Sequence, residues 1–230
     1  MIPADFSLLD LIAILLMFTS WFAYPWILKL VGIAPLNSQL GVARKRWVEQ
    51  IASRAGNPFD AILLGHVVHS VAFFGSATLI VLAGIFSIFV KLDDIYQALS
   101  GFEMIRNTSF GLFIVIYSIL AIVLTVCFFS FTYTLRKLLY SLALIGALPD
   151  KPESEQQLAE MVSETTIVIT ESLKTFNFGI RGYYYAIACI ALFVSPLACI
   201  ATTLIITVIL VFRQLKTPTS KAIKGFTKQL

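Results

Sequence analysis

Side chains of the types that do chemistry are few in this 230-residue chain. Its two histidines, His66 and His69, stand three residues apart, a spacing that places both imidazoles on one face of a helix. Two such imidazoles can share a metal ion, but a site needs a third ligand, and Asp60 is the only obvious carboxylate nearby. The histidines are kept as candidate metal ligands beside the commoner structural interpretation, and no cofactor is expected.

Three charged residues at the ends of apolar stretches form a second candidate constellation. Asp60, Arg136 and Arg181 are expected at the same membrane face, each at a helix end. A charge is costly there unless it is paired, so an aspartate between two arginines would lock three helices together as a structural ion network. The alternative is that the arginines hold a lipid phosphate or another anionic ligand.

The sequence motifs of common enzymes are missing. The chain contains no GxGxxG, Walker loop, HExxH or GxSxG pattern. Its three cysteines form no CxxC pair and fit the role of small apolar packing residues; they are Cys127, Cys189 and Cys199. No catalytic residue is assigned, and a non-enzymatic protein is expected.

Charge is distributed very unevenly along the chain. Only 13% of the residues are charged, 58% are hydrophobic and the mean hydropathy is +0.88, whereas a soluble domain carries about 25% charged residues. Four stretches contain no Asp, Glu, Lys or Arg, namely 11–28, 61–90, 107–135 and 182–212. A bilayer core about 30 Å thick needs about 20 apolar residues per helix, and each stretch meets or approaches that length. The composition excludes a soluble enzyme, a disordered tail and a secreted disulfide scaffold.

These stretches predict an all-α integral membrane protein that forms a single membrane domain over residues 1–230. Its four long transmembrane helices are expected at about 8–33, 60–90, 108–148 and 181–214, the last of them bent at Pro196. Ser7 and Asp10 have the spacing of a capping box at the start of the first helix. Three of the four charge-free stretches exceed a bilayer's needs, so their helix ends are expected to project from one face.

Two further segments, 38–55 and 154–177, repeat their apolar residues with helical period and are expected to form amphipathic extramembrane helices. The first is basic and the second acidic, so they are expected to dock onto each other and onto the projecting helix ends. Charge reversal at Glu160 and Glu164 would then impair folding or assembly. The basic tail 215–230 is expected to be flexible.

A stripe of small and slightly polar residues follows the last predicted helix at intervals of four residues. Such a stripe lets another helix approach closely, or else lines a narrow pore. The stripe consists of Ala191, Ser195, Cys199, Thr203 and Thr207.

Basic residues indicate the orientation in the membrane. With four spans, ten Lys and Arg fall on the first and third connections and seven on the other side. The positive-inside rule then favours both termini in the periplasm of a bacterial inner membrane, with loops 34–59 and 149–180 in the cytoplasm, although the basic tail opposes this. The expected partners are the lipid bilayer with its anionic head groups and either further copies of the chain or a larger membrane complex; nucleic acid is not expected.

Four runs of residues stand out along the chain: RKRW at 44–47, FFGSAT at 73–78, FTYTLR at 131–136 and FNFGIRGYYY at 176–185. They resemble the runs of a bacterial membrane family, the domain of unknown function 599. The resemblance covers nearly the whole chain and includes neither histidine. It implies a multi-spanning integral membrane protein and brings no activity with it.

Three functions remain open on this basis. The first is a non-enzymatic homo-oligomeric channel or small-solute and ion transport protein, whose stripe lines the path. The second is an accessory or assembly subunit that packs against a larger membrane complex through small-residue faces. The third is an interfacial lipid-modifying enzyme that uses the histidines and arginines.

Overall fold

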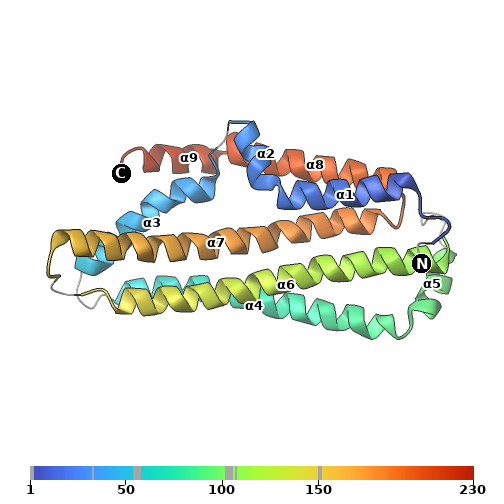
Figure 1. Ribbon diagram of the computed structural model, residues 1–230, viewed down its shortest axis with the longest axis horizontal. Coiled ribbons are helices and arrows are strands. Elements are labelled where there is room, and N and C mark those ends of the chain that lie inside the picture. Colours follow the sequence, from blue (N-terminus) through green and yellow to red (C-terminus); the bar gives the residue numbers. More distant parts are fainter. Residues whose placement is uncertain (1–2, 33, 54–57, 102–105, 107, 150–151) are drawn as a thin grey trace. The chain divides into compact units, whose positions relative to one another are not determined.

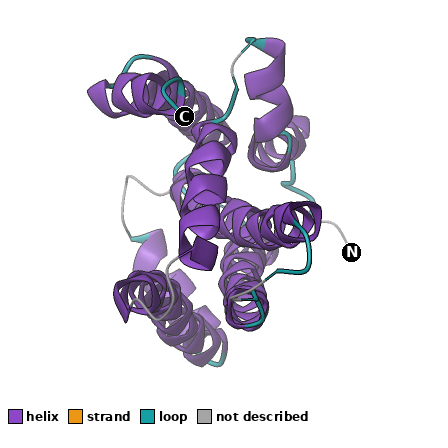
Figure 2. Cartoon of the chain, turned by 90° about the vertical axis from the view of Figure 1, so that its left-hand side faces the viewer, coloured by secondary structure: helices purple, strands orange, loops and turns teal. Residues whose placement is uncertain are grey.

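The computed structural model describes every residue except 1–2, 33, 54–57, 102–105, 107 and 150–151. All of its described elements are α-helices (Figure 2), which confirms the predicted all-α class. In chain order (Figure 1) they are α1 (Leu8–Phe22), α2 (Tyr24–Leu30), α3 (Leu36–Ser53), α4 (Pro58–Phe89), α5 (Leu92–Ser100), α6 (Phe110–Gly146), α7 (Glu155–Ala191), α8 (Pro196–Leu215) and α9 (Pro218–Thr227).

Three described helices, α4, α6 and α8, are long and apolar enough to cross a membrane. The pair α1 and α2 makes a fourth if it forms one span, although the two axes differ by 74°. Sequence predicts one helix over 8–33, and the structure breaks it at Ala23, with Pro25 in the first turn of α2. Proline has no N–H for the preceding helix and suits a helix start, which accounts for the break.

The predicted helix over 181–214 is wrong in its bounds. The amphipathic helix expected at 154–177 continues without interruption to Ala191 as α7, and a turn then separates it from α8. Ser195 and Pro196 explain the new start, because the Ser195 hydroxyl accepts a hydrogen bond from the N–H of Ala198 at 3.0 Å. Serine before proline is a helix-start signal, and reading Pro196 as a kink missed it.

The tail predicted to be flexible instead forms a helix. Helix α9 begins at an N-cap, where the Thr217 side chain accepts a hydrogen bond from the N–H of Ser220. The Ser220 hydroxyl is buried and donates to the Gln214 carbonyl at 2.6 Å. Helix α9 also contacts α3. This short segment therefore has a packing partner in α3, which the sequence alone did not identify.

The chain divides into two compact units. Unit 1 contains residues 1–31, 76–128 and 178–211; unit 2 contains 32–75, 129–177 and 212–230. Helices α4, α6 and α7 each contribute one part to each unit. Most of unit 1 is drawn from the charge-free stretches, whereas unit 2 holds the two amphipathic segments.

Unit 2 has an apolar core between α3 and α7. Val48, Val162 and Ile169 are almost completely buried there, and Ile145 and Leu148 from the end of α6 pack against them. Segments 38–55 and 154–177 thus dock onto each other and onto a helix end, as their patterns predict, although residues 54 and 55 lie outside the described ranges.

The docking does not depend on the acidic side chains. Glu160 and Glu164 are exposed, and a Glu160 carboxylate oxygen accepts its hydrogen bond from Gln156 of the same helix. Apolar contact, not charge pairing, holds these helices together, so the expected sensitivity to charge reversal has no structural basis.

We therefore predict that Val48→Asp separates α3 from α7 while Glu160→Lys leaves it in place. Val48 is fully buried, and an unpaired carboxylate at that position should cost about 3 kcal/mol of folding free energy. Thermal unfolding, followed by tryptophan fluorescence, and the rate of trypsin cleavage at Lys45 and Arg46 measure the effect. Equal cleavage rates for the two variants would contradict an apolar docking interface.

Candidate polar column and buried arginine in the membrane unit

One end of unit 1 is held by a buried ion pair. Asp10, in the first turn of α1, is 1% exposed, and its carboxylate lies 2.8 Å from Nη1 of Arg106. The other carboxylate oxygen accepts hydrogen bonds from the Ser7 hydroxyl and N–H, which completes the predicted capping box. The Arg106 N–H donates to the Phe193 carbonyl at 3.2 Å, so α1 and the α7–α8 turn meet here. We call this the Arg106 end.

Asp5 fastens the start of α6 near the same end. Its carboxylate accepts hydrogen bonds from the N–H and hydroxyl of Ser109, both at 2.6 Å. These hydrogen bonds, led by that of the hydroxyl, lower the pKa of Asp5 from its ordinary value, because they favour the charged carboxylate. Asp5 precedes the first helix and lies outside the membrane-spanning segments.

The interior of unit 1 carries neutral polar pairs. The Tyr185 hydroxyl of α7 lies 3.0 Å from the Thr207 hydroxyl of α8, and Thr207 donates to the Thr203 carbonyl. Thr78 of α4 and Tyr183 of α7 form a second hydroxyl pair. In an apolar surrounding, hydroxyl groups without partners would be costly, so such pairs fix the rotation of neighbouring helices.

The small-residue stripe splits at the α7–α8 turn. Its first two members, Ala191 and Ser195, end α7 and cap α8, and Cys199, Thr203 and Thr207 lie on α8. Cys199 and Thr203 are fully buried inside the single chain, and Thr207 bonds to Tyr185. The stripe on α8 therefore faces the chain's own helices.

The other end of unit 1 is built around the FNFGIRGYYY run. The Trp21 indole N–H donates to the Phe178 carbonyl at 3.0 Å, and the two rings stack with centroids 4.9 Å apart. A Cβ added to Gly182 would lie 2.5 Å from the Trp21 ring and would collide with Cys127 Sγ. Only glycine lets α7 approach α1 and α6 this closely. We call this the Arg181 end.

Arg181 lies in this closely packed region. Its guanidinium carbon is 4.9 Å from the centroid of the Tyr24 ring, a cation–π arrangement. Its Nε is buried and has no hydrogen-bond acceptor in the part of the chain that the structure describes. The side chain as a whole is only partly buried.

The predicted ion network is not what these charges form. Asp60 accepts a hydrogen bond from the Trp47 indole N–H at 2.7 Å, and the Arg136 Nε donates to Tyr140 of its own helix. The ion pairs found among the described residues are Arg46–Glu49, Arg106–Asp10 and Lys174–Glu171. None of them joins Asp60, Arg136 or Arg181.

The candidate metal ligands lie apart from any third ligand. His66 and His69 are both exposed on α4. Over the described ranges, no group of three His, Cys, Asp or Glu side chains is placed to hold a metal ion. These histidines are therefore not carried further as a site.

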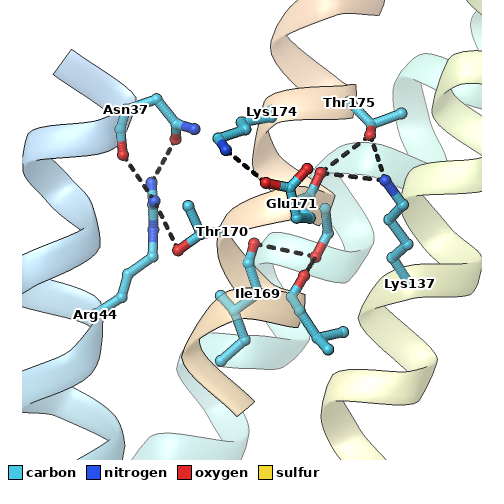
Figure 3. A network of polar contacts seen from close by, with 10 residues as sticks. Asn37, Arg44, Lys137, Ile169, Thr170, Glu171, Lys174 and Thr175 are labelled. Atoms are coloured by element: carbon cyan, nitrogen blue, oxygen red, sulfur yellow. Dashed lines mark hydrogen bonds and ion pairs between the residues drawn. The ribbon is translucent and has the colours of Figure 1, made fainter. Parts of the chain in front are cut away.

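Unit 2 has two cations that neutral oxygens satisfy (Figure 3). Arg44 donates to the Asn37 side chain at 2.7 Å, to the Asn37 carbonyl at 3.0 Å and to Thr170 at 3.5 Å. Lys137 donates to the Thr175 hydroxyl at 2.8 Å and lies 4.4 Å from the Tyr133 ring centroid. Burial lowers the pKa of Arg44 from its ordinary value, because it disfavours the charged form.

Sequence reasoning singled out Arg181 and the stripe but missed their partners. Asp10 was predicted only as part of a capping box, and its partner Arg106 lies 96 positions further along the chain. Tyr183 and Tyr185 were assigned no role, yet each bonds to a threonine of another helix. The sequence did contain one indication of these hydroxyl pairs, because tyrosines and threonines occur together on the charge-free stretches.

The packing around Gly182 generates a prediction with a matched control. Gly182→Ala should lower the melting temperature by about 5 °C, because overpacking a filled core costs about 2 kcal/mol. Gly84→Ala is the same change in a helix of the same unit, where an added Cβ meets nothing within 4 Å. It should be neutral or slightly stabilising.

Both variants are measured by thermal unfolding in detergent. A Gly182→Ala protein as stable as the Gly84→Ala protein would contradict the close approach of α7 to Trp21 and Cys127.

A model of the family described as "Protein of unknown function, DUF599" matches residues 12–219. No curated protein and no solved structure matches the chain.

Proposed function

Since the chain belongs to the DUF599 family, whose function is unknown, we propose a role from geometry: it is a non-enzymatic membrane transport protein. A small solute or ion would pass through unit 1 of a single chain. The supporting observation is the series of polar side chains inside that unit, from the Asp10–Arg106 pair through Tyr185 and Thr207 to Arg181. Polar groups within membrane helices commonly mark such pathways.

In this proposal the path lies inside one chain, whereas the sequence analysis expected a pore between several copies of the chain. A ring of copies lined by the stripe would need Cys199 and Thr203 to face a neighbouring copy, but both are buried inside their own chain. A path between α7 and α8 of one chain uses the same residues without an oligomer.

We further infer that α7 crosses the bilayer, which makes five crossings with the α1–α2 pair, α4, α6 and α8. Its last part runs from Arg181, beside Tyr24, to the turn at Phe193, whose carbonyl bonds to Arg106. It therefore connects the two ends of unit 1. Tyr185, Ala188 and Cys189 are buried by neighbouring helices, and a helix shielded by protein tolerates polar side chains that lipid would not.

Five crossings put the termini on opposite sides, unlike the arrangement expected from four spans. Only Lys91 and Arg106 belong to the connections at the Arg106 end. The basic helices α3 and α9 follow the Arg181 end along the chain. The positive-inside rule then places the N-terminus in the periplasm and the basic tail in the cytoplasm of a bacterial inner membrane, which removes the conflict over the tail.

A second candidate is the accessory or assembly subunit. Apolar side chains are exposed on the parts of α4 and α6 that belong to unit 2. They include Ile62, Leu63, Leu139 and Leu142. Exposed apolar side chains favour contact with another protein.

Replacing a hydroxyl in the path tests transport. Thr207→Val keeps the shape but removes the bond to Tyr185, and it should lower flux about fivefold, as the loss of one buried hydrogen bond predicts. Thr202→Val is the same change five residues earlier on α8 and should keep wild-type flux. Purified protein in liposomes is assayed with inorganic phosphate, chloride and potassium as probes. Absence of flux for every probe, or equal flux in both variants, would contradict the path.

Reporter fusions test the topology. Alkaline phosphatase, which is active only in the periplasm, should be inactive when fused after Leu230 and active when fused within the α7–α8 turn. Green fluorescent protein at the same sites should give the opposite pattern. An active phosphatase at Leu230 would contradict the five crossings and support four spans with both termini in the periplasm.

A further inference from the structure

We propose that Arg181 is the receptor for an anionic group, a phosphate or a carboxylate, that binds inside unit 1. This names the class of ligand for the proposed path, and it rests on the proposed crossing of α7.

Arg181 lies inside the proposed path, away from the turn that follows α7. It precedes the C-terminal end of α7 at Ala191 by ten residues, which is about 15 Å along the helix axis. A guanidinium among apolar helices is costly unless an anion or polar acceptors compensate its charge.

The described acidic residues of unit 1 are occupied at, or belong to, its opposite end. Asp10 is paired with Arg106, and Asp5 accepts both of its hydrogen bonds from Ser109. Asp93 and Asp94 lie in the first turn of α5, on the connection that ends at Arg106. Asp10 precedes Trp21, which packs against Gly182, by eleven residues, or about 16 Å of helix. None of these carboxylates forms an ion pair with Arg181 in the described ranges.

Arg106 also has a buried Nε and Nη2 without an acceptor among the described residues, but its Nη1 is paired with the Asp10 carboxylate. Two half-buried cations of unit 2 have neutral acceptors instead. Arg44 donates to three oxygens of Asn37 and Thr170, and Lys137 donates to Thr175 (Figure 3). The Nε of Arg181 is buried but has no acceptor among the described residues. Its site thus offers a donor that the protein itself does not satisfy.

The surroundings hold the guanidinium in place for a ligand. Its guanidinium carbon lies 4.9 Å from the centroid of the Tyr24 ring, and this cation–π contact helps to hold the side chain. Trp21 stacks on Phe178 and donates to its carbonyl, and these two residues precede Tyr24 and Arg181 by three positions each. A planar fork of donors held this way suits the paired oxygens of phosphate and carboxylate.

Two sources could supply this chemistry, a lipid head-group phosphate and a free anion. The experiment uses full-length protein in neutral detergent after removal of bound lipid. Binding of phosphatidylglycerol, phosphatidylcholine and inorganic phosphate is measured separately, from native mass spectra and from the rise in melting temperature. Phosphatidylglycerol binding alone would assign a lipid head group, and inorganic phosphate binding would assign a free anion.

The decisive variant is Arg181→Gln, and its matched control is Arg136→Gln. Arg136 is also an arginine over a tyrosine ring, at 5.8 Å from Tyr140, but it is exposed. Affinity for the bound anion should fall at least about tenfold in Arg181→Gln and stay at the wild-type value in Arg136→Gln. Equal affinity in the two variants, or no binding of any of these anions by the wild type, would overturn the proposal.

A measurement on the wild type covers the case in which Arg181→Gln does not fold. Phenylglyoxal modifies reachable arginines, and the bound anion should slow modification of Arg181 several-fold without changing that of Arg136. Unchanged modification of Arg181 at a saturating concentration of the anion would overturn the proposal.

The result is separable from the fate of the transport proposal. Anion binding at Arg181 without flux in liposomes would support the anion receptor and contradict the transport path. Flux that depends on Thr207 but does not change with Arg181→Gln or with bound anions would support the path and contradict the receptor.

Discussion

The close approach of α7 to α1 and α6 at Gly182 is the contact on which the rest of unit 1 depends. A side chain as small as alanine would collide there with Trp21 and Cys127, so this approach is available only to glycine. The approach sets the rotation of α7, and that rotation directs Tyr183 to Thr78, Tyr185 to Thr207 and Arg181 to Tyr24. Packing thus comes first, and the polar geometry follows from it.

The charged side chains of unit 1 have different kinds of partners at its two ends. At the Arg106 end, Asp10 is buried, one carboxylate oxygen is paired with Nη1 of Arg106, and the other accepts hydrogen bonds from Ser7. At the Arg181 end, the cation has an aromatic neighbour and forms no ion pair among the described residues, and the hydroxyl pairs of Tyr183 and Tyr185 are neutral. The proposed anion receptor rests on this difference, because Arg181 lacks the carboxylate partner that Arg106 has.

Much of the architecture could be predicted from the sequence, because a charge-free stretch longer than a bilayer permits few structures. The class, the approximate spans of α4 and α6, the capping box at Ser7 and the docking of α3 on α7 were all predicted. The errors concerned the role of one proline and the length of the amphipathic helix. Pro196 was interpreted as a kink although Ser195 makes it a helix start, and the amphipathic helix was ended at residue 177 although α7 continues to Ala191.

The sequence by itself determined that the chain is helical and belongs in a membrane, because local composition and the 3.6-residue period act over a few turns of one segment. Only the tertiary structure decided which side chains meet. Asp10 forms an ion pair with Arg106, and Thr78 forms a hydrogen bond with Tyr183. Arg181 contacts the Tyr24 ring instead of the expected partner Asp60. Partners so far apart along the chain are selected by helix rotation and contact distance, and these are set where Gly182 lets three helices meet.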